Sequence, residues 1–167
     1  MKTTFTQDDM IKFQKNLRRL NHTITTAESC TGGMVASQIT SIGGSSDVFY
    51  GGIITYANHI KEQELGVKSQ TIQDFGVVSS EVVKEMLIGV LKKFQANYAI
   101  AISGVAGPSG GSIAKPVGMV VIGIADNMGY FDIETYHFKG SRNEVQKQAT
   151  FTSLEKISQF VQKSLDK

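Results

Sequence analysis

The segment YAIAIS, residues 98–103, is short and almost entirely apolar. A strand with one face in water alternates apolar and polar residues, so this run indicates a strand in a sheet that is covered on both faces. Residues 117–125 form another apolar run of strand length. The predicted sheet therefore needs helices on both of its sides.

Apolar residues near a spacing of 3.6 predict helices, and short runs rich in β-branched or apolar residues predict strands. The expected helices cover residues 7–21, 31–40, 59–65 with Asn58 as cap, a segment capped by Ser79 or Ser80, and 142–165. The expected strands cover residues 23–27, 48–56, 98–103, 117–125 and 130–138. The turn signal DNMG joins the last two strands as a β-hairpin. This order predicts an α/β fold, a three-layer α/β/α sandwich with a mixed sheet, as one domain over residues 1–167.

Composition excludes several classes of protein. The 167 residues carry a formal net charge of +2 and scattered Lys residues, which does not favour a nucleic-acid or membrane partner. A single Cys excludes an internal disulfide framework, and the N-terminal stretch has no apolar leader core. No apolar run reaches the length of a membrane span. We expect a soluble, cytoplasmic protein.

Three polar or Gly-rich stretches follow predicted strands: AESCTGG, TYANHIK and SGVAGPSGG. In α/β sheets, ligands bind beyond the carboxyl ends of the strands, so these stretches are expected on one rim. Ser29 then lies at the start of the predicted helix 31–40. It is either an N-cap or a nucleophile beside the N–H groups of the helix end, where an oxyanion would be held.

Cys30 and Glu28 leave further alternatives open. A thiol at a helix start can be a nucleophile with a lowered pKa, but a lone Cys is also a common small core residue. Glu28 is a general base, a substrate-binding group or a charge at the helix start. Gly32 and Gly33 leave the backbone accessible to a ligand.

The base that would activate a nucleophile is sought on the same rim. His59 is the only His near it, which makes a Ser–His pair possible. Lys61 falls in the first turn of the predicted helix 59–65, where the helix dipole disfavours a cation and lowers the pKa of an amine. Tyr56 ends the preceding strand and could position a proton. The alternative is an exposed Lys and a core Tyr.

The loop SGVAGPSGGSIAKPVG, residues 103–118, holds both Pro residues of the chain. Backbone N–H groups of such loops can bind phosphate, although the spacing matches neither the dinucleotide nor the P-loop motif. Arg142 begins the last predicted helix and could bind a phosphate or be a surface cation. No residues have metal-ligand spacing, so neither a metal nor a cofactor is expected.

Four stretches resemble the CinA C-terminal domain family in order and spacing: TTAESCTGG, GGIITYANHIKEQELGV, GVVSSEVVKEM and SGVAGPSGGSIAKPVG. The GSR at residues 140–142 agrees as well, and the resemblance covers nearly the whole chain. It implies a three-layer α/β/α fold, usually as a homo-oligomer. It also implies an amidohydrolase that converts nicotinamide mononucleotide to nicotinate mononucleotide and ammonia, in pyridine-nucleotide salvage.

The resemblance places the family's nucleophile on Ser29 and its Tyr–Lys activating pair on Tyr56 and Lys61. The residues expected to contact the substrate lie on the same rim and at the start of the last helix: Glu28, Thr31, Gly32, Gly33, Gly104, Gly107, Gly110 and Arg142.

Two positions depart from the family pattern: Ser109, where many relatives have Asp, and Ser103, where many have Thr. The loss of a charge at Ser109 keeps a second hypothesis open, a non-catalytic nucleotide-binding or regulatory module. A Cys30-based enzyme is a third.

Overall fold

The computed structural model describes residues 5–167; residues 1–4 of the N-terminal stretch and of the predicted domain lie outside the described part. In this part, five strands form one mixed sheet in the order β2-β1-β3-β4-β5. β2, β1 and β3 are parallel, and β4 and β5 each run antiparallel to their neighbour. The elements, in chain order, are α1 (Gln7–Leu20), β1 (Ile24–Glu28), α2 (Met34–Thr40), η1 (Ser45–Asp47), β2 (Ile53–Ile54), α3 (Asn58–Leu65), α4 (Ser69–Phe75), α5 (Ser80–Phe94), β3 (Tyr98–Gly104), β4 (Met119–Asp126), β5 (Phe131–His137) and α6 (Arg142–Leu165).

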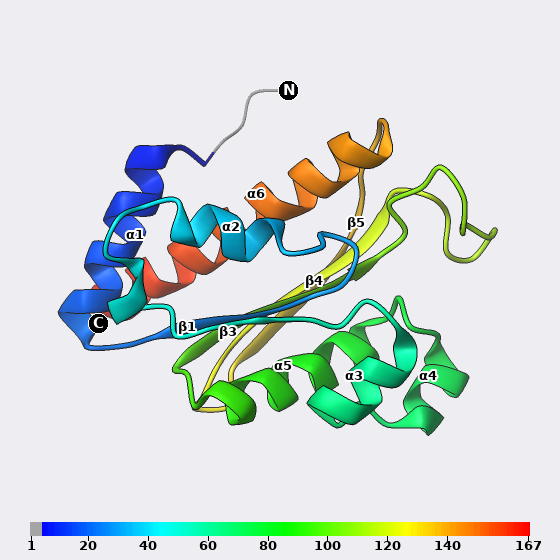
Figure 1. Ribbon diagram of the computed structural model, residues 1–167, viewed down its shortest axis with the longest axis horizontal. Helices are drawn as coiled ribbons and strands as arrows, with labels where there is room; N and C mark the ends of the chain where they lie inside the picture. Colours follow the sequence, from blue (N-terminus) through cyan, green and yellow to red (C-terminus); the bar gives the residue numbers. More distant parts are fainter. Residues whose placement is uncertain (1–4) are drawn as a thin grey trace.

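Helices cover both faces of the sheet, which confirms the predicted three-layer α/β/α class with its hairpin. α1, α2 and α6 lie on one side, and α3, α4 and α5 lie on the other (Figure 1). Local sequence signals set the starts of several helices. Thr6 with Asp9 forms a capping box at α1, and Ser141 with Glu144 forms one at α6. Ser79 accepts the backbone N–H of Val82 at the start of α5.

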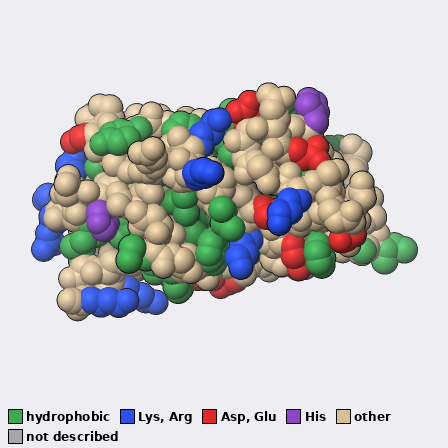
Figure 2. Space-filling view, turned by 90° about the horizontal axis from the view of Figure 1, so that it is seen from below, with side chains coloured by type: hydrophobic (Ala, Val, Ile, Leu, Met, Phe, Trp, Pro, Cys, Tyr) green, Lys and Arg blue, Asp and Glu red, His purple; other side chains and the backbone are tan. Residues whose placement is uncertain are grey.

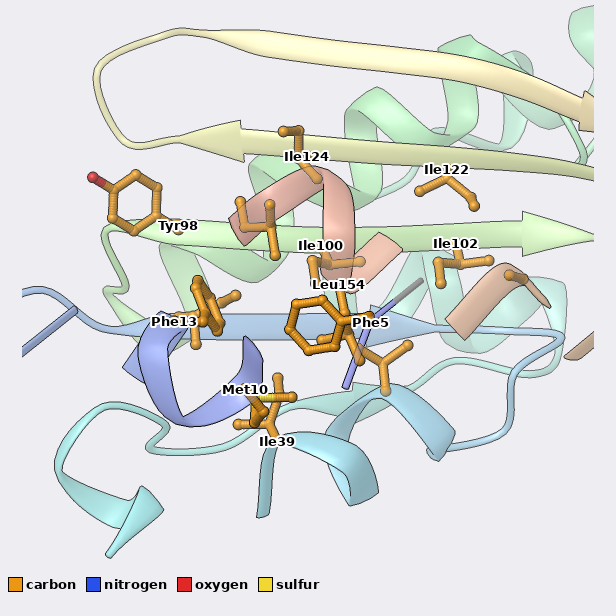
Figure 3. Close-up of a cluster of buried hydrophobic side chains, with 14 of the residues drawn as sticks. Phe5, Met10, Phe13, Ile39, Tyr98, Ile100, Ile102, Ile122, Ile124 and Leu154 are labelled. Atoms are coloured by element: carbon orange, nitrogen blue, oxygen red, sulfur yellow. The ribbon is translucent and has the colours of Figure 1, made fainter. Parts of the chain in front are cut away.

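The two faces of the central strands carry side chains of different size. On β3, Ile100 and Ile102 belong to the core beneath α1 and α6, whereas Ala99 and Ala101 belong to the core beneath α5. Figure 3 shows the first core, where Ile side chains of β3 and β4 meet aromatic and aliphatic side chains of the helices. Because successive strand residues point to opposite faces, the run 98–103 fills both cores, as its composition predicts.

The structure differs from the sequence predictions around β2. The predicted strand 48–56 is reduced to Ile53–Ile54 and an isolated bridge at Phe49. Its two Gly residues mark a close approach, since a Cβ on Gly52 would overlap the Thr26 side chain. The cap at Asn58 is also wrong: Ala57 is the N-cap residue of α3 and gives no side-chain cap. Helix α4 was not predicted.

The face that carries α3, α4 and α5 shows side chains of both charges among polar ones, with hydrophobic side chains near its centre (Figure 2). In the described part of the chain, no helix combines the length and the apolar character that crossing a membrane requires.

Candidate functional site

The parallel strands bring the predicted rim together. The carboxyl ends of β2, β1 and β3 lie side by side, and each leads into one of the three polar stretches. A pocket of about 200 Å³ opens there. Its lining comes from all three stretches, from the segment before α5 and from the start of α6: Ser29, Cys30, Tyr56, Asn58, Lys61, Val77, Val78, Ser103, Gly104, Ala106 and Arg142.

Ser29 and Lys61 meet at the base of this pocket. Ser29 follows β1 directly and is 8% exposed, and Lys61, near the start of α3, is 1% exposed. The Lys61 Nζ lies 3.1 Å from Ser29 Oγ. It also donates to the carbonyl oxygen of Thr55 at 2.6 Å and to that of Tyr56 at 3.3 Å. The amine is therefore held against the hydroxyl by two backbone carbonyls.

Burial lowers the pKa of Lys61 from 10.5 to about 8, because the charged ammonium loses its hydration in the protein interior. None of its three hydrogen-bond partners is a carboxylate that would favour the charge. A neutral amine has two N–H donors and one lone pair. With both donors on the carbonyl oxygens, the lone pair faces Ser29 Oγ, which is the arrangement of a general base and its nucleophile.

The Cys30 thiol lines the same pocket, and its pKa is shifted in the direction opposite to that of Lys61. Burial raises its pKa from 9.0 to about 12, with a smaller contribution from the nearby Glu28. The thiol is thus protonated at neutral pH and is a poor nucleophile, since the thiolate is the reactive form. This argues against a Cys30-based enzyme.

Glu28 occupies the start of α2. Its carboxylate oxygens accept the Thr31 hydroxyl at 2.7 Å and three backbone N–H groups, those of Gly33 at 3.2 Å, Val35 at 2.9 Å and Ala36 at 3.1 Å. The helix therefore starts at Met34, later than expected, and a side chain of the protein already binds its free N–H groups. The predicted oxyanion site at the helix end is replaced by an internal carboxylate cap. Glu28 is 1% exposed and lies outside the pocket lining.

Two other backbone donors remain beside Ser29. The Gly32 N–H donates to the Ser29 carbonyl and closes a tight turn, with Cys30 and Thr31 at its centre. Among residues 5–167, the Thr31 N–H donates no hydrogen bond, and the Cys30 N–H contacts only the thiol of its own residue, although the two residues are only 1% and 4% exposed. Buried backbone donors without a partner are costly, and consecutive ones can form an anion-binding nest. Gln146 of α6 fixes the turn by donating to the Cys30 carbonyl at 2.9 Å.

The Tyr56 side chain points to a different partner than expected. Its hydroxyl accepts a hydrogen bond from Arg142 Nη2 at 2.6 Å, and only its backbone carbonyl contacts Lys61. Arg142 Nη1 donates to the carbonyl of Gly107 at 2.8 Å. Tyr56 and Arg142 thus meet at the pocket, with Gly107 beside them.

The remaining predicted residues are distributed as follows. Gly104 ends β3 in the pocket lining. Gly32, Gly33 and Thr31 belong to the turn after Ser29, outside the lining. Gly110 and Ser109 lie in the exposed part of the loop, outside the lining as well. The replacement of the family's Asp by Ser109 therefore does not change the charge of the pocket lining. His59 is exposed and does not bond to Ser29.

Sequence reasoning missed several pocket residues. Asn58 was assigned to the helix cap, and it lines the pocket instead. Val77 and Val78 precede the Ser79 cap, and the carbonyl of Val77 accepts the Ser103 hydroxyl at 2.8 Å. Gln146, which lies outside the lining and bonds the Cys30 carbonyl, is far away in sequence inside an ordinary amphipathic helix and carries no signal that would identify it. No three His, Cys, Asp or Glu side chains in the described ranges are placed to hold a metal ion.

Comparison with known proteins agrees with the sequence resemblance. The sequence model of the CinA C-terminal domain matches residues 8–161. The Escherichia coli K12 protein named nicotinamide-nucleotide amidohydrolase PncC is 48% identical over 147 residues, which are 87% of this chain and 89% of that protein. A putative competence-damage inducible protein of Clostridium beijerinckii is 44% identical over 83% of this chain and 34% of its own length.

Solved structures have the same fold. The competence/damage inducible protein CihA of Agrobacterium tumefaciens matches with a TM-score of 0.87 and 35% identity, over 94% of this chain and 97% of that one. A CinA superfamily protein of Klebsiella pneumoniae matches with a TM-score of 0.89 and 28% identity, over 96% and 98% of the two chains.

The role of Glu28 as an internal cap leads to a stability prediction. Glu28→Gln puts an amide N–H₂ group where backbone N–H groups now donate, so at least one donor loses its acceptor. We expect the free energy of unfolding to fall by about 2–3 kcal/mol, measured by denaturant unfolding. Glu62→Gln on α3, a carboxylate that accepts no hydrogen bond from residues 5–167, is the matched control and should change stability by less than about 0.5 kcal/mol. Equal stabilities of the two variants would contradict the cap.

Proposed function

Because the chain belongs to the CinA C-terminal domain family, we propose that it is an amidohydrolase that converts nicotinamide mononucleotide to nicotinate mononucleotide and ammonia. The similarity to the Escherichia coli protein named nicotinamide-nucleotide amidohydrolase supports the substrate and the reaction. The observation that carries the mechanism is the 3.1 Å contact between Lys61 Nζ and Ser29 Oγ. Homo-oligomeric assembly and a cytoplasmic location stay predictions.

The charge of the pocket suits a phosphorylated substrate. Among residues 5–167, its lining includes the permanently charged Arg142 and no Asp or Glu, so the pocket keeps a positive charge even when Lys61 is neutral. Positive potential in a cleft favours a ligand that carries negative charge. The phosphate of a mononucleotide is such a group, and the carboxamide at the other end would lie over Ser29.

In the first half of the reaction, neutral Lys61 takes the proton of Ser29 Oγ while the oxygen attacks the carboxamide carbon. The negative charge that develops on the amide oxygen is held by the N–H groups of Cys30 and Thr31, neither of which donates to the backbone of residues 5–167. The intermediate then collapses, the C–N bond breaks, and Lys61 gives its proton to the departing nitrogen, which leaves as ammonia. An ester between Ser29 and the nicotinoyl group remains.

In the second half, Lys61 is neutral again and takes a proton from a water molecule that attacks the ester carbon. Collapse of this second intermediate breaks the bond to Ser29 Oγ, which recovers its proton from Lys61. Nicotinate mononucleotide leaves as the product. Tyr56 assists through its backbone carbonyl, which helps to orient the amine.

Ammonia release from nicotinamide mononucleotide tests the role of Ser29. Ser29→Ala removes the attacking oxygen, and we expect the rate to fall by at least about a thousandfold. Ser37→Ala, an exposed Ser on α2, is the control and should match the wild type. Equal rates in Ser29→Ala and wild type would reject the nucleophile, and loss of activity in Cys30→Ser alone would assign it to the thiol. Folded wild-type protein that binds the mononucleotide without releasing ammonia would support the non-catalytic alternative.

The lowered pKa of Lys61 leads to a prediction for the pH dependence. The base acts when neutral, so kcat/KM should rise about tenfold per pH unit below the pKa of about 8 and level off above it. Measurements from pH 6.5 to 10 avoid most of the titration of the substrate phosphate, whose second pKa is near 6. The Ser37→Ala control should follow the same curve. A flat profile, or a rate that falls as the pH rises through 8, would contradict Lys61 as the base.

A further inference from the structure

Arg142 connects three segments at the pocket through neutral partners. Its guanidinium donates to the Tyr56 hydroxyl, from the connection between β2 and α3, and to the carbonyl of Gly107, from the loop after β3. Arg142 itself is the first residue of α6. The side chain is therefore held in place before any ligand arrives, and a preorganised group loses less conformational freedom on binding.

The charge of Arg142 is not neutralised inside the protein. No carboxylate among residues 5–167 forms a salt bridge with it. It also lies at the N-terminal end of a helix, where the dipole disfavours a cation. A cation held at such a place, in a pocket to which residues 5–167 contribute no Asp or Glu, is suited to an anionic ligand.

Donors remain for that ligand. A guanidinium has five N–H donors, and the hydrogen bonds to Tyr56 and Gly107 use two of them, which leaves three. The pairing of a planar guanidinium with phosphate oxygens is among the stronger hydrogen-bonded contacts in proteins.

The Tyr56 hydroxyl has no other partner than Arg142 in the described part of the chain. The three hydrogen bonds of Lys61 Nζ go to Ser29 Oγ and to two backbone carbonyls, and none goes to this hydroxyl. A proton relay through the Tyr56 side chain needs a contact with one of the reacting groups, and the side chain is instead bonded to the cation.

We propose that Tyr56 is a positioning residue that holds Arg142 in the orientation that binds the substrate's phosphate. Through Arg142, the Tyr56 side chain then determines the preference for a phosphorylated nicotinamide substrate over the riboside. The riboside has the same carboxamide and lacks the phosphate. This inference rests on the proposed function and gives the Tyr56 side chain a task in substrate selection instead of proton transfer.

The two substrates separate this role from catalysis. Tyr56→Phe removes one hydrogen bond of Arg142, and we expect KM for nicotinamide mononucleotide to rise about threefold to tenfold with kcat changed less than twofold. Arg142→Gln removes the charge and should raise KM on the order of 10- to 100-fold. Neither substitution should alter KM for nicotinamide riboside. The double variant should be no worse than Arg142→Gln, since Tyr56 acts through Arg142.

Tyr50→Phe is the matched control, because this exposed hydroxyl has no hydrogen-bond partner in the described ranges and lies outside the pocket. It should leave KM for both substrates unchanged. If Tyr56→Phe lowers kcat on mononucleotide and riboside alike and leaves the preference intact, the hydroxyl acts on the reacting atoms and the proposal is wrong. An unchanged KM in folded Tyr56→Phe also overturns it.

Calorimetry in the Ser29→Ala background gives a readout that does not depend on turnover. Mononucleotide should bind more tightly than riboside, and Tyr56→Phe or Arg142→Lys should reduce the difference, since the ammonium of Lys lacks the planar fork with which the guanidinium bonds Tyr56, Gly107 and phosphate oxygens together. If Tyr56→Phe does not fold, the binding of the two compounds by Arg142→Lys tests whether the guanidinium recognises the phosphate. Absence of ammonia release by the wild type would reject the proposed function, while this binding comparison would still decide the role of Tyr56. Equal binding of both compounds by the Ser29→Ala protein would reject the phosphate role.

Discussion

The site depends on one buried interaction, the amine of Lys61 held against the hydroxyl of Ser29. An ammonium buried without a carboxylate is unfavourable, and the protein accepts this cost at the carboxyl ends of β1 and β2. The Thr55 and Tyr56 carbonyls take two hydrogen bonds of the amine, so its third direction faces Ser29. The parallel pairing of β1 and β2 brings these groups together, because their carboxyl ends lie at the same edge of the sheet.

Because side chains alternate between the two faces of a strand, the adjacent residues Glu28 and Ser29 contact different helical layers. Glu28 is the last residue of β1 and Ser29 follows it directly, and consecutive side chains of extended backbone point to opposite faces of a sheet. Glu28 binds the start of α2 in one helical layer, and Ser29 meets Lys61 of α3, which lies in the other layer (Figure 1). The carboxylate thus fixes the turn that follows Ser29 without entering the pocket. In the proposed mechanism, the N–H groups of Cys30 and Thr31 take the place of the helix end as oxyanion donors.

The sequence predicted most of the fold because its signals were local. The apolar run 98–103, the hairpin and helix 142–165 each follow from composition or periodicity within one segment. The order of strands then predicted which stretches share a rim. Side-chain partners across that rim could not be predicted: Tyr56 turns to Arg142, from a helix 86 positions away in sequence. The short strand β2 was overestimated because Gly51 and the residues around it are apolar enough to read as a strand, although few of them pair.

The proposed mechanism requires a lowered pKa at Lys61, and nitrogen NMR of the side-chain amine measures this pKa directly. In protein labelled at lysine, the Lys61 resonance is assigned by its loss in Lys61→Met, and its chemical shift is followed from pH 6 to 11. We expect a titration midpoint near 8, displaced downward by burial beside Ser29. A midpoint near 8 leaves about a tenth of the amine neutral at pH 7, whereas a midpoint at the ordinary value of 10.5 would leave less than about a thousandth neutral and would contradict the proposed general base.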